Sequence, residues 1–402
     1  MSQSFAHKHS GLLASLLLVP ASLLVLLLAS ELFFRFVVPA PDLPAPAFID
    51  GVLRHRPGQR GMYWSAPFGQ EDVRAPFCIN AQGWNSARAD YPLARTPGRQ
   101  RIALVGDSYV EALQVPPDQS MAEGLERELG AGAEVYRYGA SGAPLSQYLH
   151  MARKAALPAG PDVLVVLLVH NDFDESWRDV PGMYTKSFLR LRLGQGQDQG
   201  LNQGKDADSS VTELPPAPYR QGLTSRIRDL SATWRYLAYG RQVRFEALRR
   251  LLLPQEQQGR FQANIDISDL AGREALDRRA TAYLFGRLAA ESAQAGVRLL
   301  LVMDGVRAPI ELGERGSSPD DNVGALRLNR MAAEEAARLS IPFLDLHPVF
   351  VEDFGQRHQS FAFKTDGHWN AHAHALAARA VAVRLRELGW TAGLTPPVQP
   401  QQ

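Results

Sequence analysis

Apolar residues along this chain fall into two patterns, short continuous runs and longer stretches with helical spacing. Five short runs have the character of buried strands, and stretches with apolar residues at helical spacing separate them. Strands that alternate with helices are typical of a parallel sheet with right-handed crossovers and helices on both faces. We therefore predict an α/β fold with strands at residues 101–105, 134–138, 163–169, 297–303 and 343–344.

The helices between these strands have recognisable ends. Gly130 should end the first helix, and Pro158 should close the second. Asn370 can cap the last helix because its side-chain oxygen can accept a hydrogen bond from the first turn. The expected helices cover residues 119–129, 145–156, 274–295, 323–339 and 371–388.

An uncharged apolar stretch covers residues 11–30 near the amino terminus. At about 1.5 Å per residue it extends about 30 Å, enough to cross the core of a bilayer. A cleavable signal peptide is the alternative, because Lys8 lies upstream and small residues occur at 38–40. The run exceeds a signal-peptide core of about 7–15 residues, and Pro41 would follow the cut. The pattern favours a retained single-pass anchor in the inner membrane, with the tail 1–10 inside and the larger domain on the periplasmic side.

The remaining segments differ from the α/β pattern. Prolines between residues 39 and 46 predict an extended spacer within a lead-in segment, 31–98. Residues 174–271 make a connection of about a hundred residues, where about 4–6 is usual, so we expect an insertion with its own, mostly helical structure. The α/β domain should then cover residues 99–390, followed by a flexible tail at 391–402.

Part of the insertion predicts an amphipathic helix rich in arginine. Gly240 should break or kink it. A lid that packs on the α/β domain is the favoured interpretation, with contact to a membrane surface or a polyanion as the alternatives. Residues 194–204, rich in Gln and Gly, are expected to be mobile. The apolar positions of the predicted helix are Ile227, Leu230, Trp234, Leu237, Phe245 and Leu248.

Charge and ligand content exclude several classes of protein. The net charge of +1 provides no electrostatic signature of nucleic-acid binding. Cys78 is the single cysteine, so no intramolecular disulfide or cysteine metal site can form, and we expect a buried apolar role for it. His368, His372 and His374 lie close together in the sequence, but no complete ligand set accompanies them. We expect no metal and no other cofactor.

Four short polar motifs follow predicted strands or precede the last helix. Ligands bind beyond the carboxyl ends of the strands in an open parallel sheet, so these positions favour chemistry. The motifs offer a serine nucleophile, a histidine base and donors for an oxyanion. They are Gly106-Asp107-Ser108, Ala140-Ser141-Gly142, His170-Asn171-Asp172 and Asp366-Gly367-His368-Trp369-Asn370.

The order of these motifs resembles the four sequence blocks of the SGNH (GDSL-type) hydrolase superfamily. The resemblance covers residues 101–175 and 340–390, and the lead-in FCINAQGW at 77–84 is similar to that of bacterial membrane-anchored members. It implies a flavodoxin-like three-layer sandwich whose central parallel sheet has the strand order 2-1-3-4-5.

The resemblance also implies roles for the residues of a catalytic triad. Ser108 would be the nucleophile and His368 the base that takes its proton. Asp366 would hold the tautomer of the imidazole and stabilise the imidazolium. Many members of the superfamily place this aspartate three residues before the histidine, where this chain has Thr365.

The expected oxyanion donors are the backbone N–H groups of Ser108 and Gly142 and the side-chain amide of Asn171. Gly142 follows Ser141 at the family position, and a glycine lets the backbone approach a ligand closely. Asp172 is expected to brace the loop that presents Asn171.

Together these features predict a membrane-anchored, metal-independent serine esterase. Its substrate would be a short acyl ester, expected to be O-acetyl, on an envelope carbohydrate or lipid. An O-acyltransferase with the same residues is the nearest alternative, because a sugar hydroxyl can replace water. A non-catalytic SGNH-like binding protein in a polysaccharide assembly complex is another, although the complete Ser, His and Asn set argues against it.

Overall fold

The computed structural model describes residues 2–67, 73–180, 184, 186–194, 211–243, 270–311 and 323–391. Two compact units make up the chain. The larger consists of Pro44–Tyr63, Asp72–Arg220 and Glu256–Gln402, and the smaller of Met1–Leu43, Trp64–Glu71 and Gln221–Gln255.

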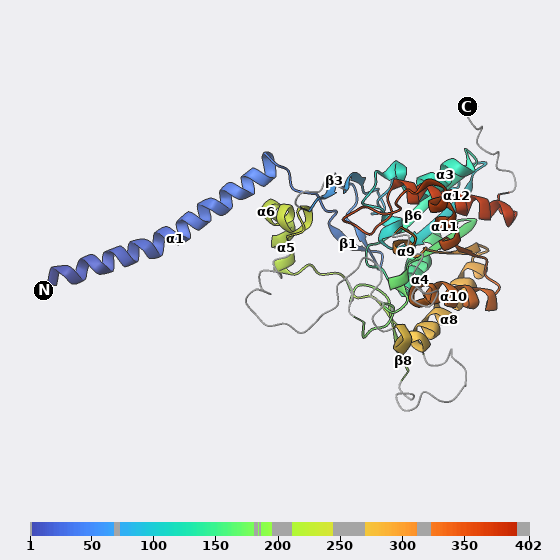
Figure 1. Cartoon of the computed structure of the whole chain (residues 1–402). Coiled ribbons are helices and arrows are strands. Elements are labelled where there is room, and N and C mark those ends of the chain that lie inside the picture. Colours follow the sequence, from blue (N-terminus) through green and yellow to red (C-terminus); the bar gives the residue numbers. More distant parts are fainter. Residues whose placement is uncertain are drawn as a thin grey trace. The chain divides into compact units, whose positions relative to one another are not determined.

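A five-stranded parallel sheet lies at the centre of the larger unit (Figure 1). Its strand order, β11-β10-β7-β5-β6, is the predicted 2-1-3-4-5 order, so the predicted fold class is confirmed. β5 is hydrogen-bonded to β6 on one side and to β7 on the other. The strands are β5 (Gln100–Gly106), β6 (Ala133–Gly139), β7 (Val163–Leu168), β10 (Arg298–Met303) and β11 (Phe343–Asp345).

Helices cover both faces of the sheet because successive strand residues point to opposite faces and both sets are apolar. Ala103 and Val105 of β5 belong to the core under α4, α8 and α10, whereas Ile102 and Leu104 belong to the core under α3, α11 and α12. Figure 1 shows the same two groups of helices. They are α3 (Met121–Leu129), α4 (Leu145–Met151), α8 (Leu270–Gln294), α10 (Val323–Arg338), α11 (His347–Arg357) and α12 (Ala371–Glu387).

Short elements complete the larger unit. The second predicted helix ends earlier than expected as an α-helix, because α4 gives way to a π turn. Asn370 caps α12 as predicted, accepting a hydrogen bond from Ala373 N at 3.0 Å. The short elements are α2 (Ser108–Glu111), η1 (Pro117–Gln119), η2 (Ala152–Ala156), η3 (Leu157–Ala159), η4 (His170–Asp172) and α9 (Arg307–Glu311).

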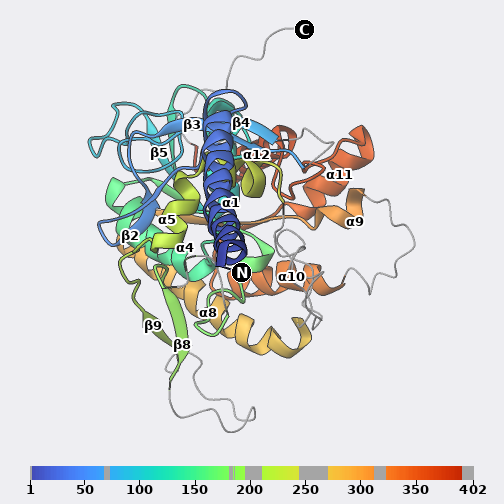
Figure 2. The same cartoon turned by 90° about the vertical axis from the view of Figure 1, so that its left-hand side faces the viewer.

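Antiparallel strand pairs precede and interrupt the α/β domain. The lead-in forms β1 (Pro46–Ile49) with β2 (Val52–His55) and β3 (Arg60–Ser65) with β4 (Val73–Cys78). The insertion forms β8 (Arg190–Leu193) with β9 (Val211–Leu214), side by side in Figure 2. The sequence patterns did not predict these pairs, because each strand is too short to show a clear period.

The lead-in motif at 77–84 makes a tight turn against the sheet. Asn80 Oδ1 accepts hydrogen bonds from Gln82 N at 3.0 Å and from Trp84 N at 2.9 Å. Trp84 is buried, edge-on to Tyr138 of β6. Cys78 is only partly buried, so the prediction of a buried cysteine was wrong.

The smaller unit contains α1 (Ser2–Phe36), whose segment Leu18–Phe36 is long and apolar enough to cross a membrane. It also contains α5 (Leu223–Leu230), α6 (Ala232–Trp234) and the π turn η5 (Arg235–Gly240). The prediction of one helix through this region was wrong. The chain breaks at Ser231, whose hydroxyl accepts a hydrogen bond from Trp234 N at 3.1 Å and so starts a new helix.

Three predicted features lie wholly or largely outside the described residues. They are the Gln- and Gly-rich segment at 195–204, the end of the predicted arginine-rich helix at 244–250 and the tail at 392–402.

Close packing at Gly139 yields a stability prediction. A Cβ there would lie 2.1 Å from Glu111 N and 2.5 Å from the carbonyl carbon of Val110, so Gly139→Ala forces backbone apart. We expect a loss of about 1–3 kcal/mol or more, as for overpacked cores. The measurement is the Tm of the detergent-solubilised full chain, where each kcal/mol corresponds to roughly 2–4 °C.

Gly286→Ala is the matched control, because a Cβ at Gly286 of α8 meets nothing within 4 Å. This substitution should keep or raise the Tm, since alanine is favoured over glycine in a helix by about 1 kcal/mol. An equal effect of the two substitutions would contradict the packing argument.

Candidate active site

The serine lies where β5 ends and α2 begins. β5 ends at Gly106, where a Cβ would lie 2.5 Å from Val110 Cγ2, so a side chain there would push the turn away from the sheet. Asp107 caps α2 through a hydrogen bond that its Oδ1 accepts from Tyr109 N at 2.9 Å. The turn presents Ser108 with 8 % of its surface exposed. A hydroxyl in this position is shielded from bulk water.

His368 connects this serine to a carboxylate. Its Nε2 lies 2.8 Å from Ser108 Oγ, and its Nδ1 is hydrogen-bonded to Asp366 Oδ1. The same Asp366 oxygen accepts a hydrogen bond from the backbone N–H of His368 at 3.0 Å. The structure therefore brings together the three residues that the sequence pointed to, and the aspartate two residues before the histidine can reach it. Asp107 Oδ2 is a second acceptor for the serine hydroxyl, at 3.2 Å.

Burial and charge act on the three ionisable groups in different directions. Burial disfavours the imidazolium, but the hydrogen bond and charge of Asp366 outweigh it and raise the pKa of His368 above 6.5. Burial also disfavours the Asp366 carboxylate, yet its hydrogen bonds and the charge of His368 lower the pKa of Asp366. Burial dominates at Asp107 and raises its pKa to about 6. The pair of His368 and Asp366 is thus suited to stabilise an imidazolium.

A second layer of contacts fixes the turn that carries His368. Gly367 O accepts hydrogen bonds from Arg307 Nη1 at 2.7 Å and Tyr109 OH at 3.1 Å. Asp304, directly after β10, accepts a hydrogen bond from Trp369 Nε1 at 3.0 Å and lies 3.4 Å from Arg307 Nη2. Sequence reasoning missed Asp304 and Arg307. The available signal was a carboxylate at the end of an apolar strand, the position that also marks the other motifs.

The two further oxyanion candidates lie in the loops that follow the strands flanking β5. Gly142 follows β6 and has a φ of +71°, a conformation that favours glycine. Asn171 follows β7, and its Oδ1 is buried with no hydrogen-bond partner among the residues that the structure describes. Asp172 Oδ2 accepts a hydrogen bond from Val169 N at 2.6 Å, so it braces this loop. The parallel register places both loops beside the turn of Ser108.

A buried carboxylate also holds the loop of Gly142. Glu111, one turn after Ser108, accepts hydrogen bonds from Ser141 N at 3.2 Å and from the Ser141 hydroxyl. His55 of β2 contacts the other oxygen of this carboxylate. Burial opposes ionisation, but His55 and the Ser141 hydrogen bonds keep the pKa of Glu111 low. The lead-in thereby supports the loop, a role that no sequence motif indicated.

The other histidines of the last block have separate partners. His372 Nε2 lies 2.6 Å from Asp353 Oδ2, and His374 Nδ1 accepts a hydrogen bond from Met121 N at 3.2 Å. Burial lowers the pKa of His374 to about 3, so it is neutral. Within the described part of the chain, no group of three or more His, Cys, Asp or Glu side chains could hold a metal ion.

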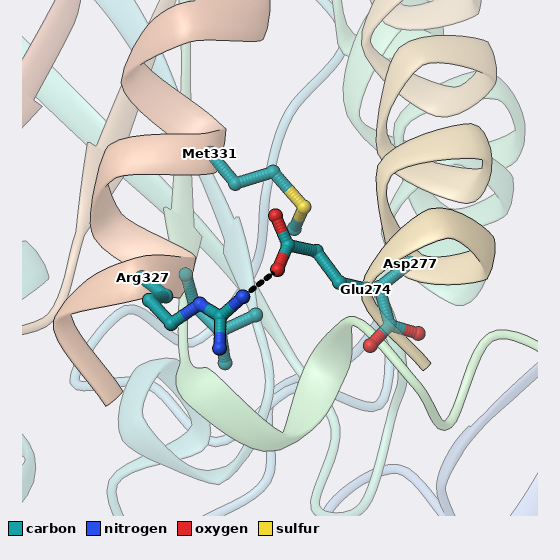
Figure 3. A pocket seen from close by; sticks show the side chains of 5 residues that line it. Glu274, Asp277, Arg327 and Met331 are labelled. Carbon is teal, nitrogen blue, oxygen red and sulfur yellow. Dashed lines mark hydrogen bonds and ion pairs between the residues drawn. The ribbon is translucent and has the colours of Figure 1, made fainter. Parts of the chain in front are cut away.

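Figure 3 shows a small hollow between α8 and α10. Arg327 fills part of it and is ion-paired with Glu274. Burial raises the pKa of Asp277 at its edge to about 7. None of the predicted site residues lines this hollow. Its charged lining residues are Glu274, Asp277 and Arg327.

Comparison with known proteins adds one family match. A family model described as "SGNH hydrolase-like domain, acetyltransferase AlgX" matches residues 266–398. None of the curated proteins matches the chain.

Solved structures with a similar fold are distant. A lipase/acylhydrolase from Enterococcus faecalis is 13% identical, with 74% of this chain and 99% of that chain covered and a TM-score of 0.38. A catalytic mutant of the acetylxylan esterase Axe2 from Geobacillus stearothermophilus is 12% identical, with 74% and 97% covered and a TM-score of 0.38. A two-domain esterase active on acetylated mannans is 11% identical, with 76% and 53% covered and a TM-score of 0.38.

The fold and the site define a class of protein. The sheet has the order 2-1-3-4-5, and a serine, a histidine and an aspartate are hydrogen-bonded in series at the carboxyl ends of its strands. These features agree with the family match, which covers residues 266–398, and support the resemblance to the SGNH hydrolase superfamily.

The raised pKa of His368 predicts how catalysis depends on pH. A neutral imidazole must accept the serine proton, so kcat/KM should increase with pH, with a midpoint above 6.5. Asp366→Asn removes the group that contributes most to raising this pKa and leaves the burial that lowers it. The midpoint should then fall, and kcat should decrease by about 10⁴, as in other triads. A pH profile of p-nitrophenyl acetate hydrolysis measures both effects.

Asp107→Asn is the control, because Asp107 contacts the same hydroxyl and has a pKa of about 6. If this variant shifts the midpoint and Asp366→Asn does not, the profile reports Asp107 and the assignment to His368 is wrong.

Proposed function

We propose that this protein is a serine esterase that cleaves short acyl esters of an envelope carbohydrate or lipid. The observation that carries the proposal is the hydrogen-bonded series from Ser108 Oγ through His368 to Asp366. A serine hydroxyl becomes an effective nucleophile when an oriented base takes its proton.

The proposed reaction has two halves. Ser108 Oγ attacks the carbonyl carbon while its proton moves to His368 Nε2, and an oxyanion forms. The alcohol then leaves with the proton from His368, and the acyl group stays on Ser108. In the second half, water attacks this acyl-enzyme, His368 takes the proton of the water, and the carboxylic acid leaves as Ser108 regains its proton.

Donors for the oxyanion come from three neighbouring loops. We assign them to the N–H groups of Ser108 and Gly142 and to the side-chain amide of Asn171. The strand order supports this assignment, because β6 and β7 flank β5. Preorganised donors of this kind stabilise charge that develops in the transition state.

We place the enzyme on a retained membrane anchor, with its catalytic domain outside the cytoplasm. The end of α1 supports retention because it is built into the smaller unit: the ring of Phe34 stacks on Tyr236 at 4.0 Å, and Glu31 accepts hydrogen bonds from Ala232 N at 2.9 Å and Thr233 N at 3.1 Å. Cleavage near residue 40 would remove these partners. No metal or other cofactor takes part in the proposed mechanism.

Transfer of the acyl group to a sugar hydroxyl is the second candidate function. The description of the matching family model, an acetyltransferase, favours it. The same residues serve both reactions, since an acceptor hydroxyl replaces water only in the second half. A non-catalytic carbohydrate-binding role would not need the orientation of His368 toward Ser108.

The nucleophile can be tested by substitution. Ser108→Ala should reduce hydrolysis of p-nitrophenyl acetate by at least about 10³, because only the oxyanion donors and binding remain. Ser292→Ala is the matched control: this serine is also buried, and within the described part of the chain its Oγ has no hydrogen-bond partner. It should keep the wild-type rate.

Mass spectrometry of the quenched reaction should locate the acyl group on Ser108 in the wild type. Treatment with EDTA should leave the wild-type rate unchanged. Loss of activity that Zn²⁺ or Mn²⁺ restores would contradict the serine mechanism.

Hydrolysis and transfer can be separated by supplying an acceptor. We expect the wild type to release free acetate from an acetyl donor at the same rate with and without an oligosaccharide. Acetylated oligosaccharide, absent with Ser108→Ala and formed faster than free acetate, would establish the transferase instead. NMR of the products measures both.

A further inference from the structure

We infer that α5 is an interfacial helix that inserts its apolar face into the membrane surface where α1 leaves the bilayer. The inference deepens the proposed anchoring and rests on it. It concerns the smaller unit alone, within which all of the following contacts lie.

The apolar face of α5 is exposed. Leu223, Ile227 and Leu230 expose 73%, 58% and 66% of their surface. Their spacing of four and three residues puts them on one face of the helix. Large apolar side chains grouped in this way at the surface mark a site of interaction with a membrane or a partner.

The position of α5 identifies the membrane as the occupant. Arg35, in the last turn of α1, donates a hydrogen bond from Nη2 to Leu230 O at 2.9 Å, at the carboxyl end of α5. The same guanidinium is ion-paired with Glu31 at 2.5 Å. Residues 11–30 precede this pair and contain no charge, so they suffice to span the bilayer core and leave Glu31 at its boundary. A span at Leu18–Phe36 would instead put both Glu31 and Arg35 inside the bilayer, which costs more. α5 therefore ends at the level where the span meets the headgroups.

Glu31 of α1 caps the start of α6, and this cap holds α6 and the preceding α5 beside the end of the membrane span. The Glu31 carboxylate accepts hydrogen bonds from Ala232 N at 2.9 Å, Thr233 N at 3.1 Å and Ser231 Oγ at 3.0 Å. These groups begin α6, so a side chain of the membrane helix caps a helix about two hundred residues later in the sequence. The cap also satisfies a carboxylate that would be costly near the hydrocarbon.

The base of α1 also exposes large apolar side chains. Phe33, Phe36 and Val37 expose 45%, 73% and 66% of their surface, and aromatic side chains are favoured at membrane interfaces. Arg226 is exposed. With 3.6 residues per turn, its position around the axis of α5 is about 60° from the centre of the apolar face. From there its guanidinium can reach the phosphate of a lipid while its stem stays with the apolar face. The pattern is that of an interfacial amphipathic helix.

The depth of three labelled positions tests the inference in the full chain. Cys78→Ser provides a cysteine-free background, to which Leu24→Cys, Ile227→Cys and Arg228→Cys are added singly and labelled with NBD. Leu24 lies in the proposed span, and Arg228 is exposed on the other side of α5 from the apolar face. The probes are nanodiscs of phosphatidylcholine and phosphatidylglycerol with nitroxide lipids, and aqueous iodide.

We expect lipid nitroxides near the headgroup to quench the label at 227 and nitroxides deep in the chains to quench the label at 24. Iodide should quench position 227 about threefold less than position 228, which faces water. Iodide quenching of 227 equal to that of 228, with 24 still deep, overturns the interfacial helix and leaves the anchor intact.

Two other outcomes also contradict the inference, and each is recognisable. A label at 227 that is protected from iodide but not quenched by any nitroxide lipid would show that protein covers the face. A label at 24 that is open to iodide would show that α1 does not span, and the proposed anchoring would fail with it. Neither outcome bears on the esterase assay.

Discussion

The site depends on the pairing of β5 between β6 and β7. Val105 of β5 lies opposite Val166 of β7, and Gly106 lies opposite Gly139 of β6. Because all three strands are parallel, their carboxyl ends meet at one edge, and the chain after each strand must turn there. The sequence motifs that follow β5, β6 and β7 form these turns. Without this register, Ser108, Gly142 and Asn171 would be three unrelated loop residues.

The histidine reaches this edge by another route. His368 precedes α12 and does not directly follow a strand of the sheet, so side-chain contacts add to the backbone bridge between Trp369 and Ala362 in positioning it. Asp304 provides them from the end of β10, because its carboxylate accepts hydrogen bonds from Trp369 Nε1 at 3.0 Å and from Gly305 N at 2.8 Å. A carboxylate at a strand end thus ties the histidine turn to the sheet that positions the serine.

The sequence predicted the parts of the structure whose causes are local. The strands are predictable because buried parallel strands are apolar on both faces, and α12 because Asn370 is a good cap. The break at Ser231 was not predictable, since part of its cause is Glu31, far away in the sequence. The contact of His55 with Glu111 was missed for the same reason. Sequence patterns show periodicity and caps, whereas a contact between side chains far apart in the sequence leaves no trace in either.

Burial decides where the negative charge of the site resides. Asp107 and Asp172 are buried and Asp366 is partly buried, and burial alone would raise the pKa of each. Burial does raise the pKa of Asp107 to about 6 and that of Asp172 well above its usual range. Of these three aspartates only Asp366 has a lowered pKa, because the hydrogen bonds and the charge of His368 outweigh the effect of burial. Among these three aspartates, the negative charge is therefore concentrated on the carboxylate that contacts the imidazole. An imidazolium formed during catalysis would meet its counter-ion without any rearrangement of the protein.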